Sequence, residues 1–112
     1  MITNLRISTD ELQSQLQQHS DKLIILCVLE TNDPEAEQFL ADFAELKAKL
    51  DYLSIAFLIL DAYEASHLSR NFQIQSKSGF LFYLDGEVQL SLQGYQGVNK
   101  FCSRIREAFV GC

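Results

Sequence analysis

Residues 23–35 read LIILCVLETNDPE, and this stretch decides how the rest of the chain is interpreted. The run from Leu23 to Leu29 is entirely apolar. A run without a polar face is typical of a strand that is buried on both sides, as in the middle of a parallel sheet. Asp33 and Pro34 then predict the start of a helix, because a carboxylate can cap free N–H groups and proline fits the first helical position. In open α/β sheets, functional sites usually lie at such strand-to-helix junctions.

The remaining patterns predict that strands and helices alternate and that a hairpin follows. Ser8 and Glu11 have the spacing of a capping box, and Asp85-Gly86 is a strong signal for a two-residue hairpin turn. Strands are expected over residues 4–8, 23–29, 53–60, 80–84 and 87–92. Helices are expected over about residues 9–19, 34–50, 65–72 and 98–109. The β-α-β-α-β order of the first three strands predicts right-handed crossovers and a parallel arrangement.

Two of the predicted helices carry wide apolar faces. On the long helix, the residues expected in the buried face are Ala36, Phe39, Leu40, Phe43, Ala44, Leu46 and Leu50. On the last helix they are Val98, Phe101, Cys102, Ile105, Ala108 and Phe109. Both helices are therefore expected to pack on the sheet.

Composition limits the size of the fold and its partners. The 112 residues suffice for one domain, residues 1–112, and a hydrophobic content of 47% supports a packed core. The net charge is −6, and residues 1–60 carry all of it, with ten acids and four bases. Nucleic acid and anionic membranes are therefore not expected as partners, because both bind through lysine and arginine. The first residues contain no signal-like apolar run, so a cytoplasmic location is expected.

The three cysteines do not predict a disulfide framework or a metal site. Cys27 lies in the most apolar strand and Cys102 lies on the apolar face of the last helix, so both are expected to be small core residues. Cys112 is expected to be exposed. Its thiol is a candidate for a mixed disulfide or an intermolecular bridge, but exposure without a role is the favoured interpretation.

Other polar residues also have plain structural interpretations. Four acids near residue 33 are expected to form a solvated rim that favours the helix dipole: Glu30, Asp33, Glu35 and Glu37. His19 and His67 are expected at the surface, without a partner for nucleophilic catalysis. Residues 76–79 are expected to form a plain loop rather than a phosphate-binding one. The sequence therefore predicts no metal, no cofactor and no catalytic residue.

Three stretches and their spacing resemble thioredoxin. They are DKLIILCVLE at residues 21–30, LSIAFLILDAYEASHLSRNFQI at 53–74 and FLFYLDGEV at 80–88. Gly94 matches a family glycine in the loop after the last strand, and the likeness extends over residues 3–110. It implies a thioredoxin-like α/β domain with a mixed five-stranded sheet and four helices. In that sheet, the first three strands are parallel and the last two form an antiparallel hairpin.

The departures from the family pattern concern its chemistry. Where thioredoxins carry Trp-Cys-Gly-Pro-Cys, this chain has TNDPE, so Asn32-Asp33-Pro34-Glu35 replaces the dithiol motif. The family's buried aspartate falls on Leu26, and its cis-proline falls on Ser78. Because Asn32 and Glu35 cannot exchange a disulfide, the resemblance implies a scaffold without dithiol activity and not an enzyme.

The same resemblance implies a partner-binding groove made by three loops. These loops are residues 31–33, 76–79 and 93–96, and Tyr95 is expected to offer an amphipathic contact there. The residues that this analogy assigns to binding are Thr31, Asn32, Asp33, Ser78, Gly79, Gly94 and Tyr95.

The sequence and its resemblance support three hypotheses about function. The favoured one is a redox-inactive thioredoxin-like module that binds another protein or peptide, for example as a chaperone or assembly factor. The second is a thiol-dependent oxidoreductase that acts through the single cysteine Cys112. The third is a structural role, in which the chain forms a homodimer or a larger assembly.

Overall fold

The structure is a computed structural model, and it describes residues 2–30, 32–62 and 78–107. Five strands form one sheet: β1 (Ile2–Arg6), β2 (Leu23–Leu29), β3 (Ile55–Asp61), β4 (Gly79–Leu84) and β5 (Glu87–Gln93). The described α-helices are α1 (Leu12–Gln18), α2 (Pro34–Leu50) and α4 (Val98–Ile105), and a 3₁₀ turn, Thr9–Glu11, precedes α1. The helix expected over residues 65–72 lies outside the described residues.

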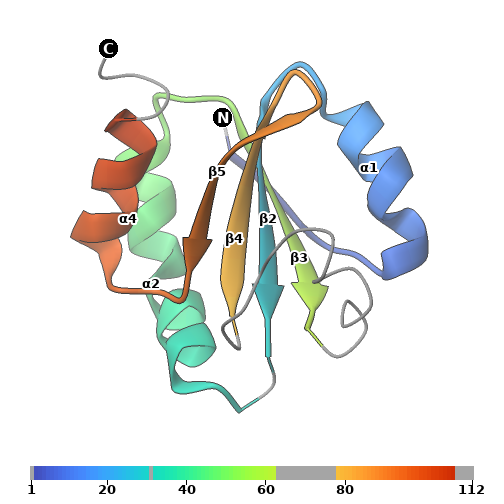
Figure 1. The fold of residues 1–112 in the computed structure, drawn as a ribbon. Helices are drawn as coiled ribbons and strands as arrows, with labels where there is room; N and C mark the ends of the chain where they lie inside the picture. Colours follow the sequence, from blue (N-terminus) through green and yellow to red (C-terminus); the bar gives the residue numbers. More distant parts are fainter. Residues whose placement is uncertain (1, 31, 63–77, 108–112) are drawn as a thin grey trace.

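The strand order across the sheet is β1-β3-β2-β4-β5. β3 pairs in parallel with both β1 and β2, while β4 pairs antiparallel with β2 and with β5. The predicted parallel and antiparallel parts are confirmed, but β3 lies between β1 and β2, so the first three strands are not in chain order. The β1-to-β2 and β2-to-β3 connections therefore run in opposite directions across the sheet, and right-handed crossovers in opposite directions place α1 and α2 on opposite faces. Figure 1 shows α2 and α4 on one face and α1 on the other.

Local signals explain where the elements begin and turn. Asp33 is the N-cap of α2 and Pro34 its first residue, as predicted. Glu11 reaches back to the Ser8 backbone, so the predicted capping box is confirmed, although its first turn is 3₁₀ rather than α. Asp85 and Gly86 both have positive φ angles, 54° and 83°, which suit the tight turn between β4 and β5.

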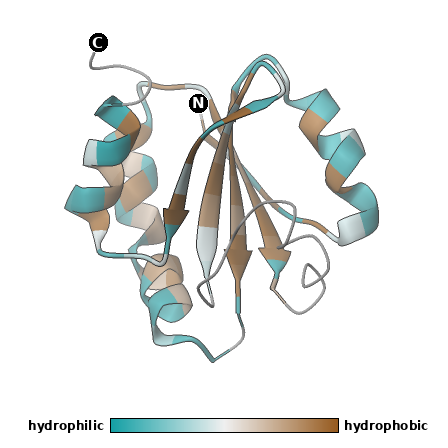
Figure 2. Cartoon of the chain, in the orientation of Figure 1, coloured by the Kyte–Doolittle hydropathy of each residue, from teal (hydrophilic) through white to brown (hydrophobic). Residues whose placement is uncertain are grey.

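The core has two layers, one on each face of the sheet, because neighbouring strand residues point to opposite faces. Toward α2 and α4, aromatic rings from four elements and a loop pack together: Phe39, Phe57, Phe80, Phe82, Tyr95 and Phe101. Toward α1, the layer is mainly aliphatic and includes Leu26, Leu58, Leu81 and Tyr83. Figure 2 shows apolar strands enclosed by helices whose outer faces are hydrophilic.

In the middle of α2, two residues that were predicted to be buried are exposed. Ala36, Phe39, Leu46 and Leu50 are buried, as expected. Leu40 is 43% exposed, however, and Ala44 is exposed as well. The buried stripe is therefore narrower than the apolar pattern, since Leu40 and Ala44 lie on the edge of the helix that turns away from the sheet.

Candidate functional site

The described parts of the three loops that were predicted to form a groove lie together. They follow β2, precede β4 and follow β5, respectively. The backbone N–H of Gly94 donates to the carbonyl oxygen of Ser78 at 2.8 Å, and the backbone N–H of Tyr95 donates to the Glu35 carboxylate, also at 2.8 Å. These hydrogen bonds join the loop after β5 to the start of β4 and to the first turn of α2.

The centre of this loop cluster is a buried pair, Asp33 and Ser78. The hydroxyl of Ser78 donates to Asp33 Oδ2 at 2.5 Å, and the backbone N–H of Glu30 donates to Ser78 Oγ at 3.3 Å. Asp33 Oδ1 also accepts the backbone N–H of Glu35 at 3.4 Å, which is the capping interaction of α2. Asp33 is only 7% exposed and Ser78 only 1%. The expectation that Asp33 belongs to a solvated acidic rim is therefore wrong.

Glu35 extends the same network toward the loop after β5. Its Oε1 atom accepts the Tyr95 N–H and lies against Gly94, whose φ angle is +82°. A Cβ atom at position 94 would collide with this carboxylate oxygen, so glycine is needed there both for its backbone angle and for space. Asp33 and Glu35 occupy two positions that the resemblance relates to the dithiol motif. Their carboxylates hydrogen-bond to neighbouring loops and so hold these loops together.

Tyr95 does not offer the exposed contact that was expected of it. It is 6% exposed, and its ring packs edge-on against Phe39 with a centroid separation of 5.5 Å. Its hydroxyl donates to Asp42 at 2.7 Å. Burial, followed by the hydrogen bond to Asp42, raises the pKa of Tyr95 above its usual value. The ring anchors the loop in the core because its apolar body is buried and its hydroxyl is paired.

The other predicted site residues differ in exposure. Asn32 is exposed and has a φ angle of +67°, a left-handed conformation that asparagine tolerates better than most residues. Gly79 is buried as the first residue of β4. Thr31 lies outside the described residues, as does Lys77, from which the peptide bond into Ser78 begins.

The two described cysteines are buried, as predicted. Cys27 is 0% exposed and Cys102 is 1% exposed. Burial is the main cause that raises the pKa of both thiols, so the reactive thiolate form is disfavoured. Cys112, which carries the single-cysteine alternative, lies outside the described residues.

The histidines and acids form no metal site within the described part of the chain. His19 was expected at the surface, but it is 7% exposed and its Nε2 is 3.2 Å from the side-chain oxygen of Gln15. Its position at the C-cap of α1 turns the ring back over the helix. His67 lies outside the described residues. Residues 2–30, 32–62 and 78–107 contain no group of three or more histidine, cysteine or acidic side chains that could hold an ion.

An open cleft lies beside the closed loop network, and the sequence did not predict it. Its volume is about 250 Å³, and it lies where β1, β2 and β3 end and α2 begins. The exposed Leu40, the smaller Ala36 and Leu29 form an apolar wall. The remaining lining residues are polar or charged: Arg6, Glu30, Asn32, Glu37 and Asp61. The signal was present in the sequence as Leu40, but helical periodicity assigned this residue to the core.

The sheet order and the loop cluster define a thioredoxin-like α/β domain. Comparison with solved structures supports this directly. The Schistosoma mansoni thioredoxin pre-protein matches with a TM-score of 0.76 and 22% identity, over 96% of this chain and 98% of that one. Chlamydomonas reinhardtii thioredoxin f2 matches with a TM-score of 0.78 and 14% identity, over 92% and 94%. A chain of the complex between ferredoxin:thioredoxin reductase and thioredoxin f2 matches with a TM-score of 0.80 and 19% identity, over 95% and 94%.

The chain therefore has the thioredoxin fold over nearly its full length. Its sequence matches no family model and no curated protein. In the described part of the chain, no helix is both long and apolar enough to cross a bilayer.

Proposed function

We propose that the chain is a redox-inactive thioredoxin-like module that binds another protein, in a role such as that of a chaperone or assembly factor. The observation that carries this proposal is the buried Asp33–Ser78 hydrogen bond. It lies where the resemblance places the dithiol motif and the cis-proline, and it joins the two loops with groups that cannot exchange a disulfide. A cytoplasmic location is part of the same proposal.

The binding surface that we assign is the cleft beside this network. Most of the predicted loop residues are buried in polar contacts, whereas Leu40 and Asn32 are exposed on the cleft wall. An exposed leucine next to a 250 Å³ cleft offers apolar area that a partner side chain can cover. One of the solved structures with this fold is a complex of ferredoxin:thioredoxin reductase and thioredoxin f2, so a protein with this fold is found with a protein partner.

The redox part of the proposal is tested by the reduction of insulin in the presence of dithiothreitol. We expect the wild-type chain to add nothing to the rate of dithiothreitol alone, because its described thiols are buried. A faster rate that disappears in a Cys112→Ser variant would establish the single-cysteine oxidoreductase instead. A faster rate that survives this substitution would refute redox inactivity without involving Cys112.

The binding part is tested by capture from the native lysate under reducing conditions. Wild type is compared with Leu40→Gln, and Tyr52→Gln is the matched control, because Tyr52 is 59% exposed and lies after the end of α2. We expect a protein that wild type and Tyr52→Gln retain and that Leu40→Gln loses. Equal retention by all three would show that the cleft is not the binding surface.

A further inference from the structure

A second surface of the molecule combines an edge strand of the sheet with a basic pocket. β5 is an edge strand, since among the described strands it pairs only with β4. An edge strand presents backbone N–H and C=O groups on which another extended chain can pair. Beside its end, a pocket of about 150 Å³ lies between β5 and α4.

Irregular pairing restricts the usable length of this edge. The β4–β5 register shifts between Phe82 and Tyr83, so that Gln89 is an extra residue between the pairs formed by Val88 and Leu90. Such a bulge interrupts regular pairing and commonly protects an edge from association. The regular stretch that remains, Leu90 to Gln93, is the part next to the pocket. An added strand would therefore be short and would lie beside residues 90–93.

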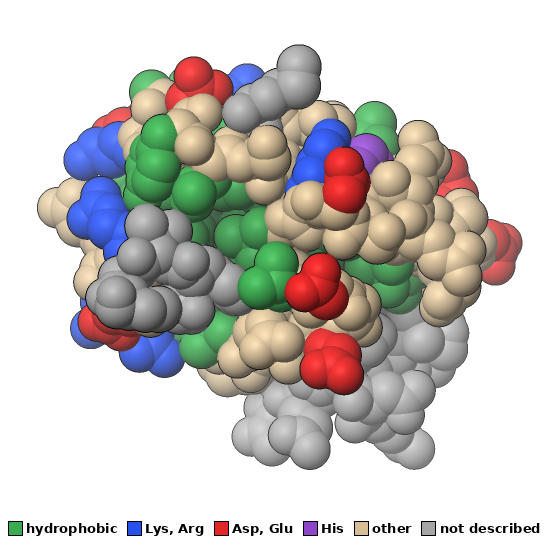
Figure 3. Space-filling model, turned by 90° about the horizontal axis from the view of Figure 1, so that it is seen from above, with side chains coloured by type: hydrophobic (Ala, Val, Ile, Leu, Met, Phe, Trp, Pro, Cys, Tyr) green, Lys and Arg blue, Asp and Glu red, His purple; other side chains and the backbone are tan. Residues whose placement is uncertain are grey.

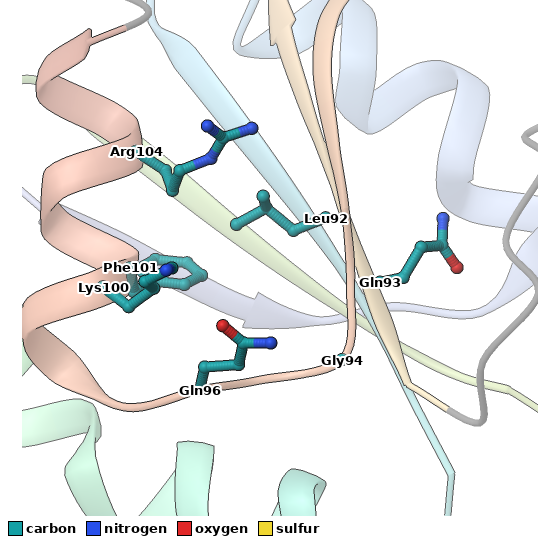
Figure 4. A pocket seen from close by; sticks show the side chains of 7 residues that line it. All are labelled: Leu92, Gln93, Gly94, Gln96, Lys100, Phe101 and Arg104. Atoms are coloured by element: carbon teal, nitrogen blue, oxygen red, sulfur yellow. The ribbon is translucent and has the colours of Figure 1, made fainter.

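The pocket has an apolar floor and a positively charged rim. Leu92 points across from β5 toward Phe101 of α4, and the side chains of Lys100 and Arg104 belong to the same helix (Figure 4). Gln96 lies at its lower end, while the side chain of Gln93 points away. The volume is smaller than the roughly 300–1,000 Å³ of typical small-molecule sites, so it suits a single side chain.

The charge of this rim is opposite to that of the molecule as a whole. The chain carries a net charge of −6, yet the pocket is lined by two cations and no acid. Within the described residues, the Lys100 side chain has no hydrogen bond or ion pair, and the Arg104 side chain has only an exposed contact of 3.4 Å with Glu107. Figure 3 shows lysine and arginine side chains gathered along the left edge of the molecule, over α2 and α4. An exposed ion pair is weak and is easily exchanged for a ligand carboxylate.

We propose that β5 and α4 bind an extended acidic segment of a partner protein, which adds a sixth strand beside residues 90–93 and inserts a glutamate between Lys100 and Arg104. A residue that pairs with Leu92 across the new strand junction stands about 5 Å from it, on the face toward α4. Its side chain therefore enters the pocket, where the apolar floor takes the methylene groups and the two cations bind the carboxylate. The residue two positions away is apolar and covers the half-buried Leu90.

This inference specifies a partner chemistry for the protein-binding role proposed above, on a different surface. The test uses a blocked hexapeptide of alternating threonine and valine in which glutamate replaces one valine, together with the matched glutamine peptide. Each is titrated into the full ¹⁵N-labelled chain while amide chemical shifts are recorded. We expect the shifts to concentrate at residues 90–93 and at α4, and the glutamate peptide to bind about fivefold more tightly.

The control variants separate this rim from general electrostatics. In Lys100→Gln/Arg104→Gln the preference for glutamate should disappear. It should persist in Lys22→Gln/Lys47→Gln, which removes the same charge from positions outside both this pocket and the cleft. Equal affinity for the two peptides, shifts centred on β1, or absence of binding would overturn the proposal. A wild-type dimer that becomes a monomer in Lys100→Gln/Arg104→Gln would also overturn it, because the edge would then serve a second copy of the chain.

None of these outcomes depends on Leu40, so the two proposals fail independently. A partner lost by Leu40→Gln, combined with equal affinity for the two peptides, would leave the protein-binding function in place and remove only the acidic segment at β5. Loss of peptide binding in the rim variant, combined with an unchanged capture by Leu40→Gln, would place binding on β5 and remove the cleft.

Discussion

Replacing Ser78 by alanine tests whether the Asp33–Ser78 hydrogen bond holds the loop cluster together. Ser78 is 1% exposed and donates to a carboxylate that is itself 7% exposed. The substitution removes this donor and also the acceptor of the Glu30 backbone N–H. Among the described residues, the Asp33 carboxylate then keeps only the longer contact with the Glu35 N–H at 3.4 Å.

The expected cost follows from the strength of hydrogen bonds to charged groups. Such a bond contributes about 1.5–3 kcal/mol to stability, and water cannot easily replace the donor at a buried site. We therefore expect Ser78→Ala to lower the free energy of unfolding by about 2–3 kcal/mol, which corresponds to a fall in Tm on the order of 10 °C for a domain of this size. The domain should still fold, because natural domains have about 5–15 kcal/mol of stability.

Urea unfolding followed by circular dichroism measures this loss. Ser54→Ala is the matched control, because Ser54 is exposed. Asp33→Asn and the Asp33→Asn/Ser78→Ala double variant complete a cycle that isolates the coupling between the two side chains. A loss below about 0.5 kcal/mol, equal to that of Ser54→Ala, would refute the view that this bond fastens the loops.

Three further predictions follow from the same structure. Gly94→Ala should lower the free energy of unfolding by about 2–3 kcal/mol in urea, whereas Gly86→Ala, which has a similar φ angle but open space around it, should cost about 1 kcal/mol. Tyr83→Phe should raise stability by about 1 kcal/mol at pH 7, because the buried hydroxyl of Tyr83 has no hydrogen-bond partner among the residues that the structure describes. Burial also raises the pKa of Tyr83 to about 12, so wild-type stability should fall as the pH rises from about 10 to about 12, and it should fall less in Tyr83→Phe. In a Cys112→Ser variant, both remaining thiols should stay unreacted with Ellman's reagent until urea unfolds the chain, and prompt reaction in native buffer would contradict their burial.

The sequence predicts most of this fold because its strongest signals are local. The apolar run of β2, the Asp33–Pro34 helix start and the Asp85–Gly86 turn each occupy only a few residues, and each is found where it was expected. The place of β3 between β1 and β2 is different, since it depends on which face of the sheet each crossover helix covers. That choice arises from tertiary packing and the handedness of crossovers, not from any single residue.

The candidate site was predicted in its location but not in its physical character. The resemblance to thioredoxin placed the three loops together, but Asp33 was expected in a solvated acidic rim and Tyr95 at an exposed partner contact. Hydrogen bonds to residues distant in sequence offset the cost of burying these polar groups. Ser78 bonds to Asp33, and Asp42 bonds to Tyr95. Such pairs, separated by 45 and 53 residues, leave no periodic trace in a single sequence.

The polar network explains why binding should lie around the loop cluster rather than within it. Buried polar groups stabilise a fold only when each has a partner, and a ligand that competes for Asp33 or Glu35 would break the bonds that join the loops. The exposed groups that a partner could contact lie next to this network. Leu40 is an exposed apolar side chain on one side, and Lys100 lies with the edge strand β5 on another. A partner can cover both without disturbing any bond of the network. The loop cluster of this thioredoxin-like fold is thus closed by its own hydrogen bonds, and the exposed apolar and cationic side chains lie in the neighbouring cleft and beside the edge strand β5.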